Sequence, residues 1–238
     1  MNNASMSFLA GTSVWSRWAV LSWVLALLGT LAACTSPPPV PDWQLNAKSS
    51  IERATEAGLR GDSRIEAVEF ARARAEVART GQPALMARLA LLRCATRMAS
   101  LDFAPCSGFE ALAADAAPPE RAYARYLAGE ATPADAALLP PAHRSVASLP
   151  ATPTAPDAAL AAIADPQSRL IAAGVLLRRG QATPGVIESA VDAASGQGWR
   201  RPLLAWLGVQ LQRVQVAGAV QETARIQRRI DLVLQDPR

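Results

Sequence analysis

Prolines that can begin helices and glycines that can end them divide most of the chain after residue 42 into short segments. Proline is favoured in the first helical turn, where its missing N–H needs no partner, and glycine is favoured just beyond the last turn. The prolines at expected helix starts are Pro83, Pro118, Pro133, Pro166, Pro184 and Pro202. The chain is rich in alanine, the best helix former, and only 5% of its residues are aromatic. The sequence therefore predicts an all-α fold.

Polar residues mark further helix starts. Asp42 is expected to cap a helix over residues 43–59, and residues 63–66 (Ser-Arg-Ile-Glu) have the spacing of a capping box that opens a helix lasting to Gly81. Residues 107–110 (Ser-Gly-Phe-Glu) have the same spacing and predict a short helix to about Ala116.

Three glutamates of the second expected helix alternate with arginines. The residues are Glu66, Glu69, Glu76, Arg72 and Arg79. Opposite charges about one helical turn apart stabilise a solvated helix face. We therefore expect a salt-bridged surface here, although paired carboxylates that work as acid and base cannot be distinguished from it by spacing alone.

Short helices joined by one to four residues are typical of antiparallel hairpins. We therefore expect the hairpins to stack in a solenoid-like arrangement. Residues 57–83 resemble a tetratricopeptide-type hairpin, with Gly61 and Asp62 at the turn and Ala67 and Phe70 inside the second helix. The resemblance implies a tetratricopeptide-like architecture, and no 34-residue repeat recurs elsewhere in the chain.

Five prolines lie within residues 140–156 and interrupt the helical pattern. This composition predicts a linker or a long surface loop. We therefore expect an N-terminal helical lobe over residues 42–139 and a C-terminal helical lobe over residues 157–238. The second lobe is expected to end in a hairpin whose turn is at Gly218.

The first 33 residues have the pattern of a secretory signal peptide. They contain no acidic residue and one basic residue, Arg17, which precedes an apolar run. A basic start, an apolar core of about 7–15 residues and a small-residue cleavage site define such a peptide. The run is shorter than the roughly 20 residues that span a bilayer.

Residues 31–34 (Leu-Ala-Ala-Cys) resemble the lipobox of bacterial lipoproteins. The resemblance implies cleavage before Cys34, a diacylglycerol on its thiol, and acylation such as palmitate on the new amino terminus. Thr35, rather than an aspartate, follows the cysteine, which in that family implies the outer membrane. Residues 34–41 then form a proline-rich tether. The alternatives are an uncleaved signal anchor and an ordinary signal peptide with a chance cysteine.

Two cysteines remain after Cys34, namely Cys94 and Cys106. In an oxidising periplasm, two cysteines twelve positions apart predict one structural disulfide between the end of a helix and the following loop. The alternative is a redox pair, but the chain has no C-x-x-C motif.

The formal net charge of +4 comes almost wholly from arginine, because Lys48 is the only lysine. Acids and arginines are interspersed, with no block of like charges. We therefore expect no nucleic-acid partner.

Few residues could support catalysis. His143 is the only histidine and lies in the expected linker, so it can neither build a histidine-rich metal site nor act as a rigidly held base. The chain has no P-loop, no dinucleotide-binding glycine pattern and no G-x-S-x-G motif. We expect no cofactor, no metal and no enzymatic activity.

The sequence favours a scaffold, adaptor or assembly factor that contacts another envelope protein and is held at the membrane by its lipid. Aromatic residues often anchor protein interfaces, and the candidates are Trp43, Tyr123, Tyr126 and Trp199, although core packing also explains each. The alternatives are a cell-wall (peptidoglycan) enzyme or its regulator, and a structural spacer without a specific partner.

Overall fold

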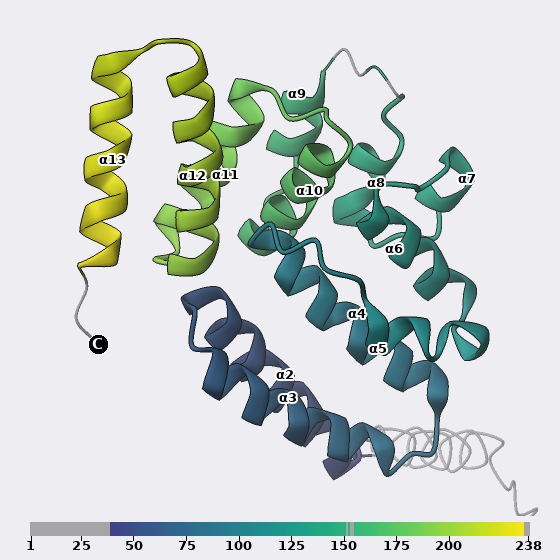
Figure 1. The fold of residues 1–238 in the computed structure, drawn as a ribbon. Helices are drawn as coiled ribbons and strands as arrows, with labels where there is room; N and C mark the ends of the chain where they lie inside the picture. Colours follow the sequence, from purple (N-terminus) through teal and green to yellow (C-terminus); the bar gives the residue numbers. More distant parts are fainter. Residues whose placement is uncertain (1–38, 151, 153–154, 236–238) are drawn as a thin grey trace, which may run out of the picture. The chain divides into compact units, whose positions relative to one another are not determined.

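The computed structural model describes residues 39–150, 152 and 155–235 of the 238-residue chain. This part of the chain contains twelve α-helices, one 3₁₀ helix and no β-strand (Figure 1). The all-α prediction is therefore confirmed for the described residues. The chain divides into two units between Val40 and Pro41, and the helices of the described residues all belong to the second unit.

In chain order the α-helices are α2 (Asp42–Arg60), α3 (Ser63–Ala78), α4 (Pro83–Ala99), α5 (Ser107–Glu110), α6 (Pro118–Ala128), α7 (Pro133–Ala136), α8 (Pro141–Ala147), α9 (Pro156–Ala161), α10 (Pro166–Arg178), α11 (Pro184–Gly196), α12 (Arg200–Val216) and α13 (Val220–Leu234). The 3₁₀ helix, η2 (Ala113–Asp115), lies between α5 and α6.

Local caps begin α10 and α11, which start at Pro166 and Pro184 as the sequence predicts. An Asp165 carboxylate oxygen accepts a hydrogen bond from the Ser168 N–H at 2.7 Å, and the Thr183 hydroxyl oxygen accepts one from the Val186 N–H at 3.1 Å. A proline follows each capping residue. These side chains satisfy N–H groups that have no partner inside the helix.

The capping box predicted at the start of α3 is wrong. Asp62 is the N-cap residue, and Ser63 is the first residue of the helix. The Ser63 hydroxyl instead accepts a hydrogen bond from the Arg201 guanidinium at 2.5 Å. The Glu66 carboxylate bonds to Arg93 and Arg201, so contacts with distant helices replace the local cap.

The capping box predicted at Ser107 is also wrong. Cys106 is the N-cap residue of α5, and no side chain caps that helix. The single helix expected to reach Ala116 is instead a four-residue α5 followed by η2.

Residues 140–156, predicted as a linker or loop, contain helix α8. Pro140 and Pro141 occupy its N-cap and first helical position, where a proline is compatible with a helix. Helix α8 packs against α7, α9 and α10 and buries His143, Val146 and Ala147. The prolines therefore begin a packed helix here, and the unit from Pro41 to Arg238 includes both predicted lobes.

Helix α10 lies in the middle of the described helices (Figure 1) and contacts α4, α6, α8, α9 and α11. Its residues from Leu170 to Leu176 are all buried. A helix that is apolar on all sides is suited to the interior of a protein. One hydrophobic cluster includes α10 and extends from Leu59 to Ile226.

A second, smaller cluster joins the first hairpin to α4. Its buried members are Ala47, Ala73, Val77 and Leu89, which come from α2, α3 and α4. Helix α12 also contacts α2, although about 140 positions separate them in sequence. The contacts of α10 and α12 thus join helices from several hairpins.

Candidate functional site

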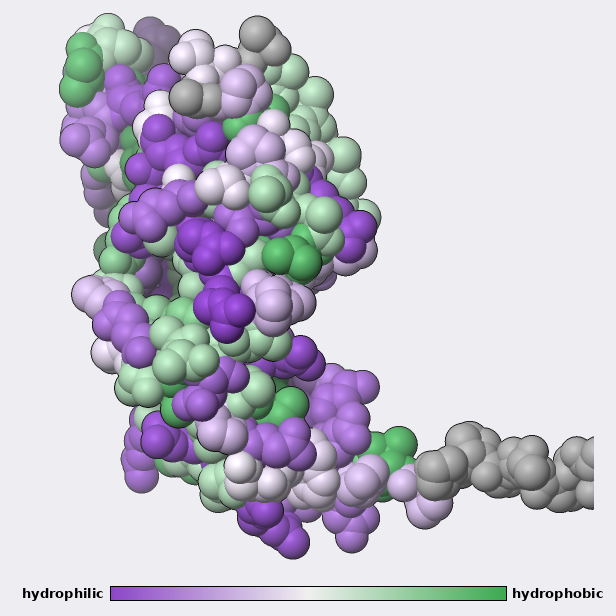
Figure 2. Space-filling model, turned by 90° about the vertical axis from the view of Figure 1, so that its right-hand side faces the viewer, coloured by the Kyte–Doolittle hydropathy of each residue, from purple (hydrophilic) through white to green (hydrophobic). Residues whose placement is uncertain are grey.

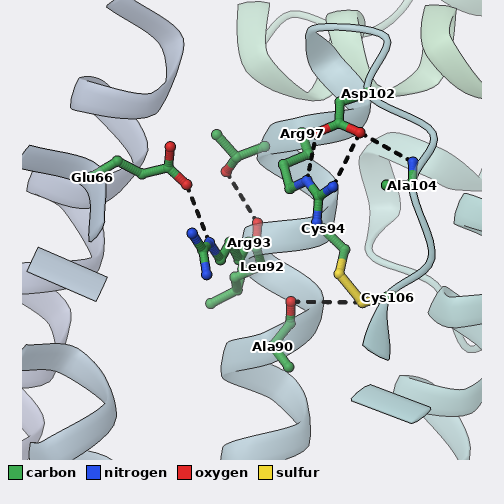
Figure 3. Close-up of a disulfide and its surroundings, with 10 residues drawn as sticks. Glu66, Ala90, Leu92, Arg93, Cys94, Arg97, Asp102, Ala104 and Cys106 are labelled. Atoms are coloured by element: carbon green, nitrogen blue, oxygen red, sulfur yellow. Dashed lines mark hydrogen bonds and ion pairs between the residues drawn. A yellow bond between two sulfur atoms is a disulfide. The ribbon is translucent and has the colours of Figure 1, made fainter. Parts of the chain in front are cut away.

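Cys94 and Cys106 form a disulfide (Figure 3), and a cavity lies beside it. Cys94 belongs to α4, Cys106 precedes α5, and their Cα atoms are 5.9 Å apart. The cysteine pairing predicted from the sequence is present in the structure. The bond holds the loop between α4 and α5 against the side of α4.

The cavity has a volume of about 470 Å³ and is formed by α3, α4, α5 and the loop before α5. The disulfide forms part of its wall. The larger apolar side chains in the lining are Phe70, Met86, Leu89 and Leu112. The arginines in the lining are Arg74, Arg93 and Arg97. The cavity therefore combines an apolar surface with guanidinium groups.

Arg93 is held between an aromatic ring and a carboxylate. Its guanidinium carbon lies 4.7 Å from the centroid of the Phe70 ring, and its Nε donates to the Glu66 carboxylate at 3.2 Å. Figure 3 shows the Glu66 side chain extending from α3 toward Arg93 on α4. Both contacts restrict the arginine to one side of the cavity.

Arg97 makes two hydrogen bonds to Asp102, from Nε at 2.7 Å and from a terminal nitrogen at 3.1 Å. The same carboxylate accepts a hydrogen bond from the Ala104 N–H at 3.1 Å. The hydrogen bond from Arg97 lowers the pKa of Asp102, and Asp102 raises the pKa of Arg97. This pair holds the loop that carries Cys106.

Arg74 has no carboxylate or other polar partner among the described residues, and its side chain is exposed. The charged side chains in the cavity wall, together with those bonded to them, are Arg74, Arg93, Arg97, Glu66 and Asp102. Three positive charges therefore meet two negative charges, and Glu66 is also shared with Arg201, so the site is electropositive.

The charge pattern predicted on α3 is only partly present. Glu69 bonds to Arg72 at 2.5 Å and Glu76 bonds to Arg79 at 2.9 Å, as expected for side chains one turn apart. Glu66 instead reaches other helices, and Glu66 and Glu69 are both buried. Nothing in the local spacing distinguishes Glu66, because its arginine partners are 27 and 135 positions away.

The four predicted interface aromatics do not come together. Trp43 is half-buried in the first turn of α2, and Trp199 is buried before α12, where its indole N–H donates to Glu56 at 3.2 Å. Only Tyr123 and Tyr126 are neighbours, with ring centroids 6.0 Å apart. Tyr126 is fully buried, whereas Tyr123 lines a separate cavity of about 390 Å³ between α4, α6 and α8.

His143 packs against these two tyrosines instead of lying in a flexible linker. Its Nδ1 is 3.3 Å from the Tyr126 hydroxyl, and its ring centroid is 5.6 Å from that of Tyr123. Burial lowers the pKa of His143 to about 4 and raises the pKa of Tyr126. The imidazole is therefore neutral at pH 7 and forms part of the core.

Within residues 39–150, 152 and 155–235, no cluster of three or more histidine, cysteine or acidic side chains is arranged to hold a metal ion. None of the described helices combines the length and the apolar character needed to cross a bilayer. The predicted lipidation site, Cys34, lies outside the described residues.

Figure 2 shows hydrophilic and hydrophobic residues interspersed over the face that looks toward the right of Figure 1. The cavity beside the disulfide has the same mixed character. Comparison with known proteins identifies no relative: the chain matches no family profile, no curated protein and no solved structure.

Proposed function

We propose that this protein is lipid-anchored at the periplasmic face of the outer membrane. There it acts without catalysis as a scaffold, adaptor or assembly factor for another envelope protein. The lipobox-like residues 31–34 and the proline-rich residues that follow support the anchor and its tether. A cysteine pair at disulfide distance is compatible with an oxidising compartment.

The composition of the cavity beside the disulfide carries the proposal of a binding role. Its lining combines apolar side chains, three arginines and one hydroxyl group, that of Ser107. No histidine or carboxylate is among the described residues that line it, so Ser107 has no base there to activate it. Such a lining suits recognition of a partner better than catalysis.

The α2–α3 hairpin, with two residues between its helices, supports a finer proposal about architecture. The resemblance of residues 57–83 to a tetratricopeptide hairpin implies a stack of helical hairpins that presents an extended surface. Under this proposal, the exposed side of α3, where Ile65 is 53% and Val68 is 46% exposed, forms a second part of the partner surface.

A regulator of a cell-wall enzyme is the second candidate function. A cavity of about 390 Å³ on the other side of the disulfide is lined by Asp102, Glu110 and Glu130. However, the ion pair with Arg97 lowers the pKa of Asp102, which is the wrong direction for a general acid. This cavity therefore favours regulation by contact over hydrolysis.

Crosslinking in intact cells tests the proposed function. A photo-reactive residue would replace Ala111, an exposed alanine in the cavity lining, and the matched control would replace Ala224, an exposed alanine on α13. We expect a specific envelope protein to be trapped from position 111 and not from position 224. No adduct from either position would support a structural spacer instead.

Metabolic labelling tests the anchor separately. Palmitate is expected to label the wild-type chain in the membrane fraction, and Cys34→Ala should abolish the label, because the thiol and the processed amino terminus would both be lost as acylation sites. Labelling that survives in Cys34→Ala would contradict lipidation at this residue.

A further inference from the structure

We propose that the cavity beside the disulfide binds an acidic segment of the partner protein, with a carboxylate side chain next to one or two apolar side chains. This inference rests on the proposed function and specifies the chemistry of the partner. The observation that carries it is the combination of unbalanced arginines and an apolar lining in one open cavity.

The positive charge of the cavity comes mainly from Arg74, because carboxylates neutralise the other arginines in its wall. Asp102 neutralises Arg97 through two hydrogen bonds, and Glu66 is shared between Arg93 and Arg201. Arg74 has no such partner within the described part of the chain. A carboxylate from a ligand would therefore find a guanidinium that needs no existing ion pair to be broken.

Two of the three arginines, Arg93 and Arg97, are also held in place before a ligand arrives. Arg93 lies over the Phe70 ring, and the Arg97–Asp102 pair and the disulfide secure the opposite wall. Groups that are already ordered lose little conformational entropy on binding, which favours affinity.

The size and lining of the cavity favour a short peptide over a lipid. A volume of about 470 Å³ is within the range for pockets that bind small ligands. The apolar lining is interrupted by guanidinium groups and by backbone of the loop before α5, so it offers no continuous apolar channel for an acyl chain. Alternating apolar and acidic side chains would match this lining.

Binding of defined peptides to the full chain in detergent, with its disulfide intact, tests the proposal. The probes are fluorescent octapeptides that alternate Leu or Phe with Glu, and matched peptides with Gln or Lys in place of Glu. We expect the Glu peptides to bind about tenfold more tightly than the Gln peptides, and more weakly as salt rises. Equal binding of the three sets, or preference for Lys, would overturn the proposal.

Two variants with the same change in net charge locate the site. Arg74→Glu is expected to weaken binding of the Glu peptides about tenfold. Arg228→Glu, on α13, should leave their affinity within about twofold, because it lies outside the cavity wall. If both variants weaken binding equally, the effect is one of overall charge and the site assignment is wrong.

Two further measurements separate this proposal from its alternatives. Arg74→Gln, compared with wild type by thermal unfolding and by peptide binding, shows whether binding is lost while the fold is kept. Displacement of bound Glu peptide by dihexanoyl phosphatidylglycerol would show a lipid headgroup site and overturn the peptide assignment. Crosslinking from position 111 without Glu-peptide binding would retain the proposed function and reject only the ligand class.

Discussion

The carboxylate of Glu66 links α3 to two other helices. It accepts hydrogen bonds from Arg93 on α4 and Arg201 on α12, each at 3.2 Å. We expect Glu66→Gln to lower the free energy of unfolding by about 1–2 kcal/mol, measured by urea denaturation, because both ion pairs are lost. This loss of unfolding free energy is smaller than the loss expected on breaking a fully buried ion pair, because water still reaches both arginines.

Glu76→Gln on the same helix is the matched control. Its partner, Arg79, is one turn away and largely exposed, and such pairs contribute little. We expect a change of no more than about 0.5 kcal/mol. Equal losses from the two variants would show that Glu66 has no special role between helices.

His143 should make the stability of the protein depend on pH. Its pKa is about 4 when folded and near 6.5 when unfolded, so the unfolded chain takes up the proton first as pH falls. The contribution of the neutral imidazole to the free energy of unfolding is therefore fully present above pH 6.5. It is lost as the pH falls toward 4, which lowers the free energy of unfolding by up to about 3 kcal/mol.

Thermal unfolding of wild type and His143→Gln between pH 7 and pH 4 measures this effect. The variant should be less stable at pH 7 but lose less stability over the same interval. Asp102 and Asp135 also have lowered pKa values, but they act mainly below pH 4, where their unfolded forms become protonated. Parallel curves for the two proteins would exclude His143 as the source.

At the scale of elements, the contact between α10 and α4 depends on a glycine. A methyl group built on Gly174 would lie 2.6 Å from the Met98 carbonyl oxygen. We expect Gly174→Ala to lower the free energy of unfolding by about 1–3 kcal/mol, because the helices must separate to accept it. Urea denaturation measures the change.

Gly208→Ala is the matched control, because Gly208 is exposed within α12 and a methyl group there meets no atom within 4 Å. Alanine should stabilise that helix by about 0.5–1 kcal/mol. The same substitution should therefore lower the free energy of unfolding at Gly174 and raise it at Gly208. A stabilising Gly174→Ala would show that the two helices do not approach so closely.

The disulfide joins α4 to the loop before α5. Its removal in Cys94→Ser with Cys106→Ser opens the loop between two cysteines twelve positions apart and should lower the free energy of unfolding by about 3 kcal/mol. Differential scanning calorimetry of the double variant and the oxidised protein measures the loss. Two thiols that react with a labelling reagent in the native, oxidised protein would contradict the bond itself.

At the scale of the whole unit, one hydrophobic cluster extends from Leu59 to Ile226 and includes helices from both predicted lobes. Helices that share a core are expected to unfold together. Calorimetry of the full chain should therefore show a single transition for residues 41–238. Two separate transitions would instead favour independent lobes on either side of residues 140–156.

Most helix positions could be predicted because their causes are local. Asp165 and Thr183 satisfy N–H groups three residues ahead of them, and the prolines that follow restrict the backbone without any distant partner. The same kind of reasoning failed at Pro140 and Pro141. Prolines are compatible with a loop and with a helix start, and packing against α10 decides between them.

Local patterns in the sequence specify that the described residues are helical, where most of their helices begin, and which two cysteines can pair. Contacts between distant segments place Glu66 beside two arginines of other helices, bury His143, and put Arg74 in a cavity wall with no polar partner among the described residues. The difference arises from the sequence distance over which each kind of interaction acts. Caps and helix propensity act within about one turn, whereas burial and charge pairing depend on segments up to 135 positions away.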